Sequence, residues 1–270
     1  MQNSFSSLIV IGAASLALSP NLAAQVVTHV QLLEKNGPGE PAPRRDLYGA
    51  WAGPIGAKRG EEPSFTPAGL ARFKLNIPGT FSTDSNDPYL KCDPWGFPRN
   101  LLQESKGLAF SQMPDRIIMT SQYDRIGRIV WMDGRELPRN VGAKGGPKSR
   151  WYGYSVGHWD GDYTLVVNTN GLDVRSWLDQ AGHPHSADMR VEERYTRVSY
   201  NVLETTVTVD DPKFYTKPFV LLTNTYRWIP SQFPSFGTVG EFDEQFCVPS
   251  DMDEYNKIML GSAGEDQAKK

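Results

Sequence analysis

Residues 155–169, SVGHWDGDYTLVVNT, place an Asp-Gly-Asp turn between two short runs that are rich in β-branched and aromatic residues. This arrangement is typical of a β-hairpin. Further runs of the same kind follow at intervals of about ten residues, and they occupy residues 115–124, 125–134, 189–200, 201–211 and 219–228. Short strands at this spacing predict a mainly β fold, an antiparallel meander that is closed as a barrel or folded as a sandwich.

The region before these strands predicts one short helix among long loops. The stretch FTPAGLARF offers Thr66 as the helix cap and Pro67 at the first helical position, with Leu70 and Phe73 on one side. We find no alternation of helices with strands and no glycine-rich phosphate loop. A nucleotide-binding fold is therefore not expected.

The two ends of the chain predict export and a single folded domain. Residues 1–24 hold an apolar run followed by small residues, as in a cleaved signal peptide, and the run is shorter than the about 20 residues that span a bilayer. Residues 25–46 predict a mobile arm because they are rich in Pro, Gly and charge. We expect a single β domain over residues 47–256 and a disordered tail over residues 257–270.

The composition favours a periplasmic or secreted protein with no membrane span once mature. The formal net charge is −3, and no clustered basic face is evident, so nucleic acid is not an expected partner. The two cysteines are Cys92, in the Pro- and Gly-rich loop of residues 77–99, and Cys247. In an exported protein this even number favours a disulfide, worth roughly 5 kcal/mol in the chain-entropy model. A thiol nucleophile is the less favoured alternative, since no histidine adjoins either cysteine.

The stretch DLYGAW at residues 46–51 places Gly49 and Trp51 in a G-x-W arrangement. It resembles the opening of lipocalin barrels. The resemblance implies a lipocalin-like barrel with an apolar interior, in which Trp51 packs across the closed end. On the residues alone, Trp51 is equally well explained as an ordinary core side chain.

A longer series of motifs spans nearly the whole predicted mature chain: DLYGAW, CDPWGFPR, RIVWMDGR, SVGHWDGDYTLVV, WLDQAGHPHS, RVEERYTR and DPKFYTKP. In this order the series resembles a group of exported proteins of soil bacteria. The resemblance implies export but no particular activity. It also implies a core motif whose positions match Asp179, His185, Ser186, Glu193 and Arg194. The positions that match His158 and His183 vary in that group.

The stretch HPHSADMRVEERYTR at residues 183–197 carries the candidate site. If the segment is extended throughout, His183, His185 and Glu193 point the same way as Met189 and Tyr195, toward the interior. A buried carboxylate costs several kcal/mol unless it is paired or protonated. Glu193 is therefore either a proton-transfer group or one half of a fold-specifying pair with a buried Tyr, Arg or His.

We expect His185, Glu193 and Asp179 to form the catalytic unit. Asp179 would fix the tautomer of His185, and Glu193 would share its proton, which together make a competent acid and base. The alternative is a metal site that uses His158, His183 and His185 with Glu193, since H-x-H on one strand face is ligand spacing. We expect the substrate to contact aromatic side chains near the site, namely Tyr123, Trp131, Tyr154, Trp159 and Tyr195.

These features favour an exported, cofactor-independent enzyme that transfers protons on a small hydrophobic or aromatic molecule, as a lyase, isomerase, cyclase or hydrolase. The first alternative is a lipocalin-type binding protein, indicated by Gly49 and Trp51. The second is a histidine-ligated metalloenzyme. A third is an envelope interaction protein, indicated by the Pro-rich arm.

Overall fold

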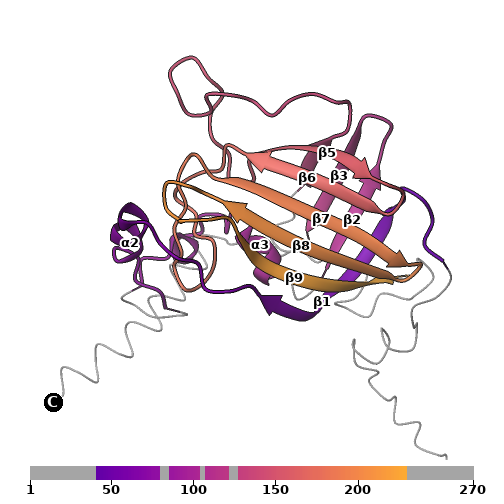
Figure 1. Cartoon of the computed structure of the whole chain (residues 1–270), viewed down its shortest axis with the longest axis horizontal. Helices are drawn as coiled ribbons and strands as arrows, with labels where there is room; N and C mark the ends of the chain where they lie inside the picture. The colour runs from indigo at the N-terminus through magenta and orange to yellow at the C-terminus, as the bar shows by residue number, and fades with distance from the viewer. Residues whose placement is uncertain (1–40, 80–84, 104–106, 122–126, 230–270) are drawn as a thin grey trace, which may run out of the picture.

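A computed structural model describes residues 41–79, 85–103, 107–121 and 127–229. Nine strands of this described part close into a barrel in sequence order (Figure 1), so the prediction of a mainly β fold is confirmed, and of its two forms the barrel is the correct one. The strands are β1 Gly49–Arg59, β2 Leu108–Gln112, β3 Arg116–Ser121, β4 Gly127–Trp131, β5 Tyr154–Asp160, β6 Thr164–Asn170, β7 Arg190–Ser199, β8 Val202–Asp210 and β9 Phe219–Ile229. Short helices are α2 Pro67–Phe73, η1 Pro88–Lys91 and α3 Arg99–Gln103.

One strand pair departs from the predicted antiparallel meander. β4 and β5 are parallel, with Val130 opposite Ser155, whereas every other neighbouring pair in the barrel is antiparallel. Parallel neighbours need a crossover connection rather than a tight turn. Residues 132–153 supply it as a lobe outside the barrel (Figure 1).

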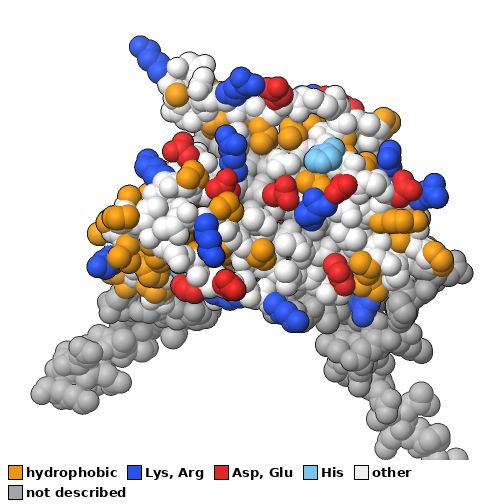
Figure 2. All heavy atoms as spheres, viewed as in Figure 1, with side chains coloured by type: hydrophobic (Ala, Val, Ile, Leu, Met, Phe, Trp, Pro, Cys, Tyr) orange, Lys and Arg blue, Asp and Glu red, His pale blue; other side chains and the backbone are white. Residues whose placement is uncertain are grey.

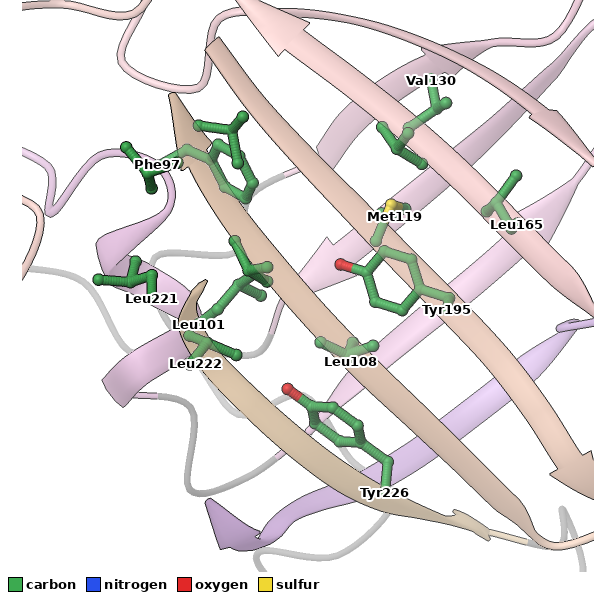
Figure 3. Close-up of a cluster of buried hydrophobic side chains, with 14 of the residues drawn as sticks. Phe97, Leu101, Leu108, Met119, Val130, Leu165, Tyr195, Leu221, Leu222 and Tyr226 are labelled. Carbon is green, nitrogen blue, oxygen red and sulfur yellow. The ribbon is translucent and has the colours of Figure 1, made fainter. Parts of the chain in front are cut away.

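Side chains fill the interior of the barrel. Alternate residues of β7 face inward, so that Val191, Glu193 and Tyr195 are each 0% exposed. Val191 and Tyr195 belong to a hydrophobic core that also includes Leu108 and Tyr226 from other strands (Figure 3). Burial of these apolar side chains supplies the main driving force for closing the barrel.

Helix α2 begins where the sequence predicts it. The Thr66 side chain accepts a hydrogen bond from the Gly69 backbone amide at 3.1 Å, as expected of a helix cap. Phe73 packs inward against Phe65, with ring centroids 4.9 Å apart. Leu70, predicted on the same side, is 41% exposed.

Trp51 lies fully buried at the start of β1. Its indole nitrogen donates to the Leu47 carbonyl oxygen at 2.9 Å, and the Arg197 guanidinium lies 4.9 Å from the ring centroid. Arg197 also donates to the Asp46 carbonyl oxygen at 2.7 Å. The last residues of the predicted N-terminal arm are therefore held against this end of the barrel.

Several predictions lie outside the described residues: the signal peptide, residues 25–40 of the arm, residues 230–256 of the domain, and the tail at residues 257–270. Cys247 lies there too, so its disulfide with Cys92 stays a prediction. Within the part of the chain that the structure describes, no helix combines the length and apolar character needed to cross a membrane.

Candidate active site at the mouth of the barrel

Residues 177–187 form a loop with turns at 180–181 and 187–188 rather than the start of a strand. Asp179 accepts hydrogen bonds from the backbone amides of Ala181 and His183 at 3.0 and 3.2 Å. Gly182 adopts a positive φ of 85°, which glycine tolerates without strain. The alternation predicted from His183 therefore fails before β7. Ser186, which an extended backbone from His183 would point away from the interior, is buried.

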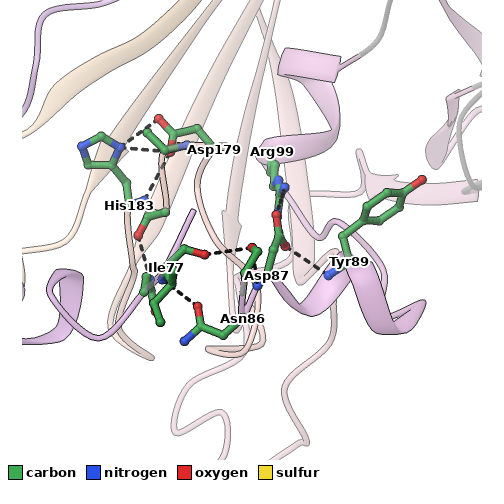
Figure 4. Close-up of polar contacts among 11 residues, drawn as sticks. Ile77, Asn86, Asp87, Tyr89, Arg99, Asp179 and His183 are labelled. Atoms are coloured by element: carbon green, nitrogen blue, oxygen red, sulfur yellow. Dashed lines mark hydrogen bonds and ion pairs between the residues drawn. The ribbon is translucent and has the colours of Figure 1, made fainter. Parts of the chain in front are cut away.

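The turn brings His183 and Asp179 together (Figure 4). His183 Nδ1 lies 3.0 and 2.9 Å from the two carboxylate oxygens of Asp179. Its other ring nitrogen, Nε2, lies 2.8 Å from Oε1 of Glu62, a side chain that is 79% exposed. Phe73 of α2 stacks on the imidazole with centroids 5.0 Å apart, and Phe65 with centroids 5.7 Å apart. The ring is thus held by a carboxylate on one edge and by aromatic faces.

The charges around His183 favour its protonated form. Burial opposes that form, but the hydrogen bonds and charges of Asp179 and Glu62 outweigh it and raise the pKa of His183 above its ordinary value of 6.5. Burial likewise opposes ionisation of Asp179, but His183 and the Arg59 guanidinium lower the pKa of that carboxyl. Arg59 Nη1 lies 3.4 Å from Asp179 Oδ2. In the protonated form, both ring nitrogens of His183 donate to carboxylates.

A pocket of about 40 Å³ opens beside this pair, between the end of β1 and the start of β9. One wall is apolar and comprises Leu102, Leu178, Phe219 and Leu221. The other wall carries Arg59, Glu62 and His183. Apolar side chains with a few polar groups are the usual lining of a small-molecule site.

His185 does not join this pair, contrary to the prediction that Asp179 would fix its tautomer. It is 2% exposed, with Nε2 2.9 Å from Ser176 Oγ and Nδ1 3.1 Å from the Ser186 carbonyl oxygen. Burial lowers the pKa of His185. Ser186 in turn donates its hydroxyl and its backbone amide to the Asp211 carboxylate, at 2.7 and 2.6 Å. These contacts brace the turn against β8 and its following loop.

Glu193 also lies apart from the histidines. Arg128 Nη2 lies 2.7 Å from both of its carboxylate oxygens, and the Tyr195 hydroxyl donates to Oε1 at 2.5 Å. Burial and the Glu193 charge raise the pKa of Tyr195. No hydrogen bond or ion pair of the described residues joins Glu193 to His185. The buried pair with Arg and Tyr is the structural alternative that the sequence left open.

The predicted substrate-contacting aromatics are dispersed rather than gathered at one site. Trp131 is flanked by the Arg116 and Arg135 guanidiniums at 4.3 and 3.6 Å. Tyr154 donates to the Lys148 carbonyl oxygen at 2.8 Å. The remaining three comprise Trp159, which packs on the core, Tyr195, which lies inside the barrel, and Tyr123, which lies outside the described residues.

The three histidines of the predicted metal site also lie apart. His158 is exposed on β5, His183 contacts Asp179 and Glu62, and His185 contacts Ser176. Over the described ranges, no group of three or more His, Cys, Asp or Glu side chains is arranged to hold a metal ion. The H-x-H spacing fails as a ligand pair because Pro184 and the turn point the two rings to different partners.

Sequence reasoning missed Glu62, Arg59 and Arg128. Glu62 and Arg59 come from the end of β1 and the loop after it, about 120 residues before His183, and no local pattern links them to the turn. Arg128 could not have been found either, because Ile129 and Trp131 make the opposite face of its strand look like the buried one, whereas Ile129 is exposed and Arg128 is buried. Comparison with family models, with curated proteins and with solved structures gave no match.

Proposed function

We propose that this protein is an exported, cofactor-independent enzyme that transfers protons on a small apolar or aromatic molecule that bears a carbonyl group. The observation that carries this proposal is the placement of His183, whose Nδ1 is held by Asp179 while Nε2 faces Glu62 in the pocket. This refines the predicted catalytic set, in that Asp179 acts with His183 in place of His185.

The proposed chemistry is enolisation, as in an isomerase or lyase. The substrate carbonyl oxygen takes the place of the Glu62 carboxylate at His183 Nε2, and that N–H gives its proton to the oxygen as the enol forms. Glu62 takes the proton from the carbon next to the carbonyl. Asp179 stabilises the imidazolium before transfer, and Arg59 attracts the developing negative charge on oxygen. In a substrate with a C=C bond at the β,γ position the enol is a dienol. Return of the proton from Glu62 to the γ carbon, with return of the oxygen proton to His183, then gives the conjugated isomer with no net change in protons or electrons.

The raised pKa of His183 suits this role. General acids work best when their pKa lies near the working pH, and the two carboxylates move the pKa of His183 upward from 6.5. At about 40 Å³ the pocket takes in only the reacting end of a substrate, and contact of that end with the apolar lining would favour binding by about 25 cal/mol per Å² buried.

Deuterium incorporation in D2O tests this proposal without knowledge of the net reaction. The mature protein is incubated with a panel of small aromatic and aliphatic ketones, aldehydes and esters, and loss of the α C–H signal is followed by proton NMR. We expect exchange of at least one member, a decrease of about 100-fold or more in His183→Gln, and a similar decrease in Glu62→Gln.

The matched control is His158→Gln, which alters an exposed histidine on β5 outside the pocket. It should retain the full exchange rate. Exchange that survives in His183→Gln, or that falls equally in His158→Gln, would contradict the proposal.

A second candidate function is binding of an apolar ligand without turnover, the lipocalin-type alternative. A pocket of about 20 Å³ reaches toward the interior past Phe97 and Met119. Arg128 Nη1 and Asn100 Oδ1 line it, and neither has a hydrogen-bond partner within the described residues. A volume of about 20 Å³ holds about one water molecule, so a larger ligand would enter only where the Phe97 and Met119 side chains move aside. Native mass spectrometry would support binding if a ligand co-purifies unchanged and is lost in Asn100→Leu.

A further inference from the structure

The crossover between β4 and β5 forms a groove on the outside of the barrel. Residues 132–153 stand as a lobe above the ends of β6 and β7 (Figures 1 and 2). The groove has a volume of about 620 Å³, which lies within the range of about 300–1,000 Å³ common for small-molecule sites. It shares no lining residue with the pocket at His183.

Contacts between the lobe and the barrel hold the groove open. Asn170 Nδ2 donates to the Pro138 carbonyl oxygen at 2.9 Å, and the Arg150 amide donates to the Gly171 carbonyl oxygen at 3.0 Å. A Cβ atom at Gly171 would lie 2.9 Å from Val141, so the lobe packs directly on the strand end. A preformed groove pays little ordering cost when a ligand binds.

Polar side chains with no protein partner face this groove. Inward-facing residues of β6 and β7 alternate with outward-facing Asn168 and Arg190. No hydrogen bond or ion pair within the described residues engages the side chains of Asn168, Asp188 or Arg190, all of which line the groove. Asn170 also lines the groove, but its Oδ1 lies beneath the surface, buried and without a hydrogen-bond partner in the described part of the chain.

The charge and the chemistry of the walls select the ligand class. The Glu136 and Arg139 side chains form an ion pair of 2.6 Å, and the remaining charges, Asp188 and Arg190, are opposite in sign. A ligand of either charge would thus gain no net attraction from these four groups. Amide side chains each provide donors and an acceptor, and Leu137 and Val141 add apolar surface. A sugar ring, which has an apolar C–H face and hydroxyl groups around its edge, matches this combination of amide and apolar side chains.

We propose that the groove binds a neutral oligosaccharide. The hydroxyl groups of the sugar donate to Asp188, and they accept from Arg190 and the Asn168 amide. The apolar strip of the lobe contacts the C–H face of a sugar ring. The groove is separate from the proposed active site, and sugar binding there does not depend on the proposed enzyme activity.

Isothermal titration of the mature protein with maltotriose, cellotriose, xylotriose and N,N′,N″-triacetylchitotriose tests the proposal, with trigalacturonate as the anionic comparison. We expect one or more of the neutral sugars to bind. The double variant Asn168→Ala/Asp188→Ala should weaken that binding at least about tenfold through the loss of two hydrogen bonds. The control Glu204→Ala, an exposed change on β8 outside the groove, should bind with unchanged affinity.

Two outcomes would overturn the proposal. They are failure of all four neutral sugars to bind, whether or not trigalacturonate binds, and binding that the double variant leaves unchanged while its thermal unfolding matches that of the parent. Because His183→Gln leaves the groove intact, retention of sugar binding by that variant would separate this site from the proposed enzyme activity.

Discussion

Arg128→Met should destabilise the fold strongly, because it leaves the Glu193 carboxylate buried without its cation. Glu193 is 0% exposed, and both of its oxygens lie 2.7 Å from Arg128 Nη2. Loss of one member of a buried pair typically costs about 3–5 kcal/mol. Loss of the Phe97 contact, 4.2 Å from the guanidinium to the ring centroid, adds to this cost. The free energy of unfolding of a typical domain is only about 5–15 kcal/mol, so the variant should be marginally stable.

Urea unfolding followed by tryptophan fluorescence measures the effect as a lower midpoint at an unchanged m-value. The double variant Arg128→Met/Glu193→Leu removes both charges from the interior. Its loss of stability should therefore be smaller, by about 2 kcal/mol or more, than the sum of the two single losses. A cost below about 1 kcal/mol for Arg128→Met, or simple additivity of the two single changes, would refute the assignment of a buried, mutually dependent pair.

Three further predictions concern the turn and the helix beside it. The pKa of His183 is raised in the folded protein, so the contribution of this residue to stability is fully present below about pH 6.5 and is lost as the pH rises through the folded-state pKa. The urea midpoints of the parent and His183→Gln should therefore converge above the folded-state pKa. The pKa of His185 is lowered in the folded protein, so the contribution of this residue to stability is present above about pH 6.5 and is lost as the pH falls. The difference in stability between the parent and His185→Gln should become smaller as the pH is lowered, and a larger difference at low pH would refute this. Thr66→Ala removes the side chain that accepts from Gly69 at the start of α2 and should cost about 1 kcal/mol, measured by thermal unfolding, with Thr208→Ala on β8 as a comparison that leaves the cap unchanged.

Local patterns predicted most of the barrel because they depend on neighbours in sequence. The alternation in MRVEERYTRVSY correctly placed Val191, Glu193 and Tyr195 on the inner face of β7. The parallel pairing of β4 with β5 was not predictable, since the sequence of each strand is compatible with either direction. In a sequence, a crossover connection is visible only as a long irregular segment, and residues 132–153 form such a segment between β4 and β5.

The candidate site was harder to predict because it depends on contacts between distant segments. Counting alternate residues from His183 failed at Ser186, which is buried, because the chain turns at Gly182 and Pro184 and is not extended there. The pairing of Asp179 with His183 is local, four residues apart, and follows from that same turn. Glu62 could not be assigned to the site, since only the closure of the barrel brings it to the imidazole.

The pKa of the His183 ring tests the central claim most directly. Proton NMR titration of the assigned imidazole Cε1–H signal would be made in the parent and in Asp179→Asn, with exposed His158 as the internal reference. The account predicts that His183 titrates above 6.5 and that Asp179→Asn shifts its pKa downward, because the carboxylate that stabilises the imidazolium is lost. A His183 pKa at or below 6.5, or one that Asp179→Asn leaves unchanged, would contradict the proposed acid and base pair.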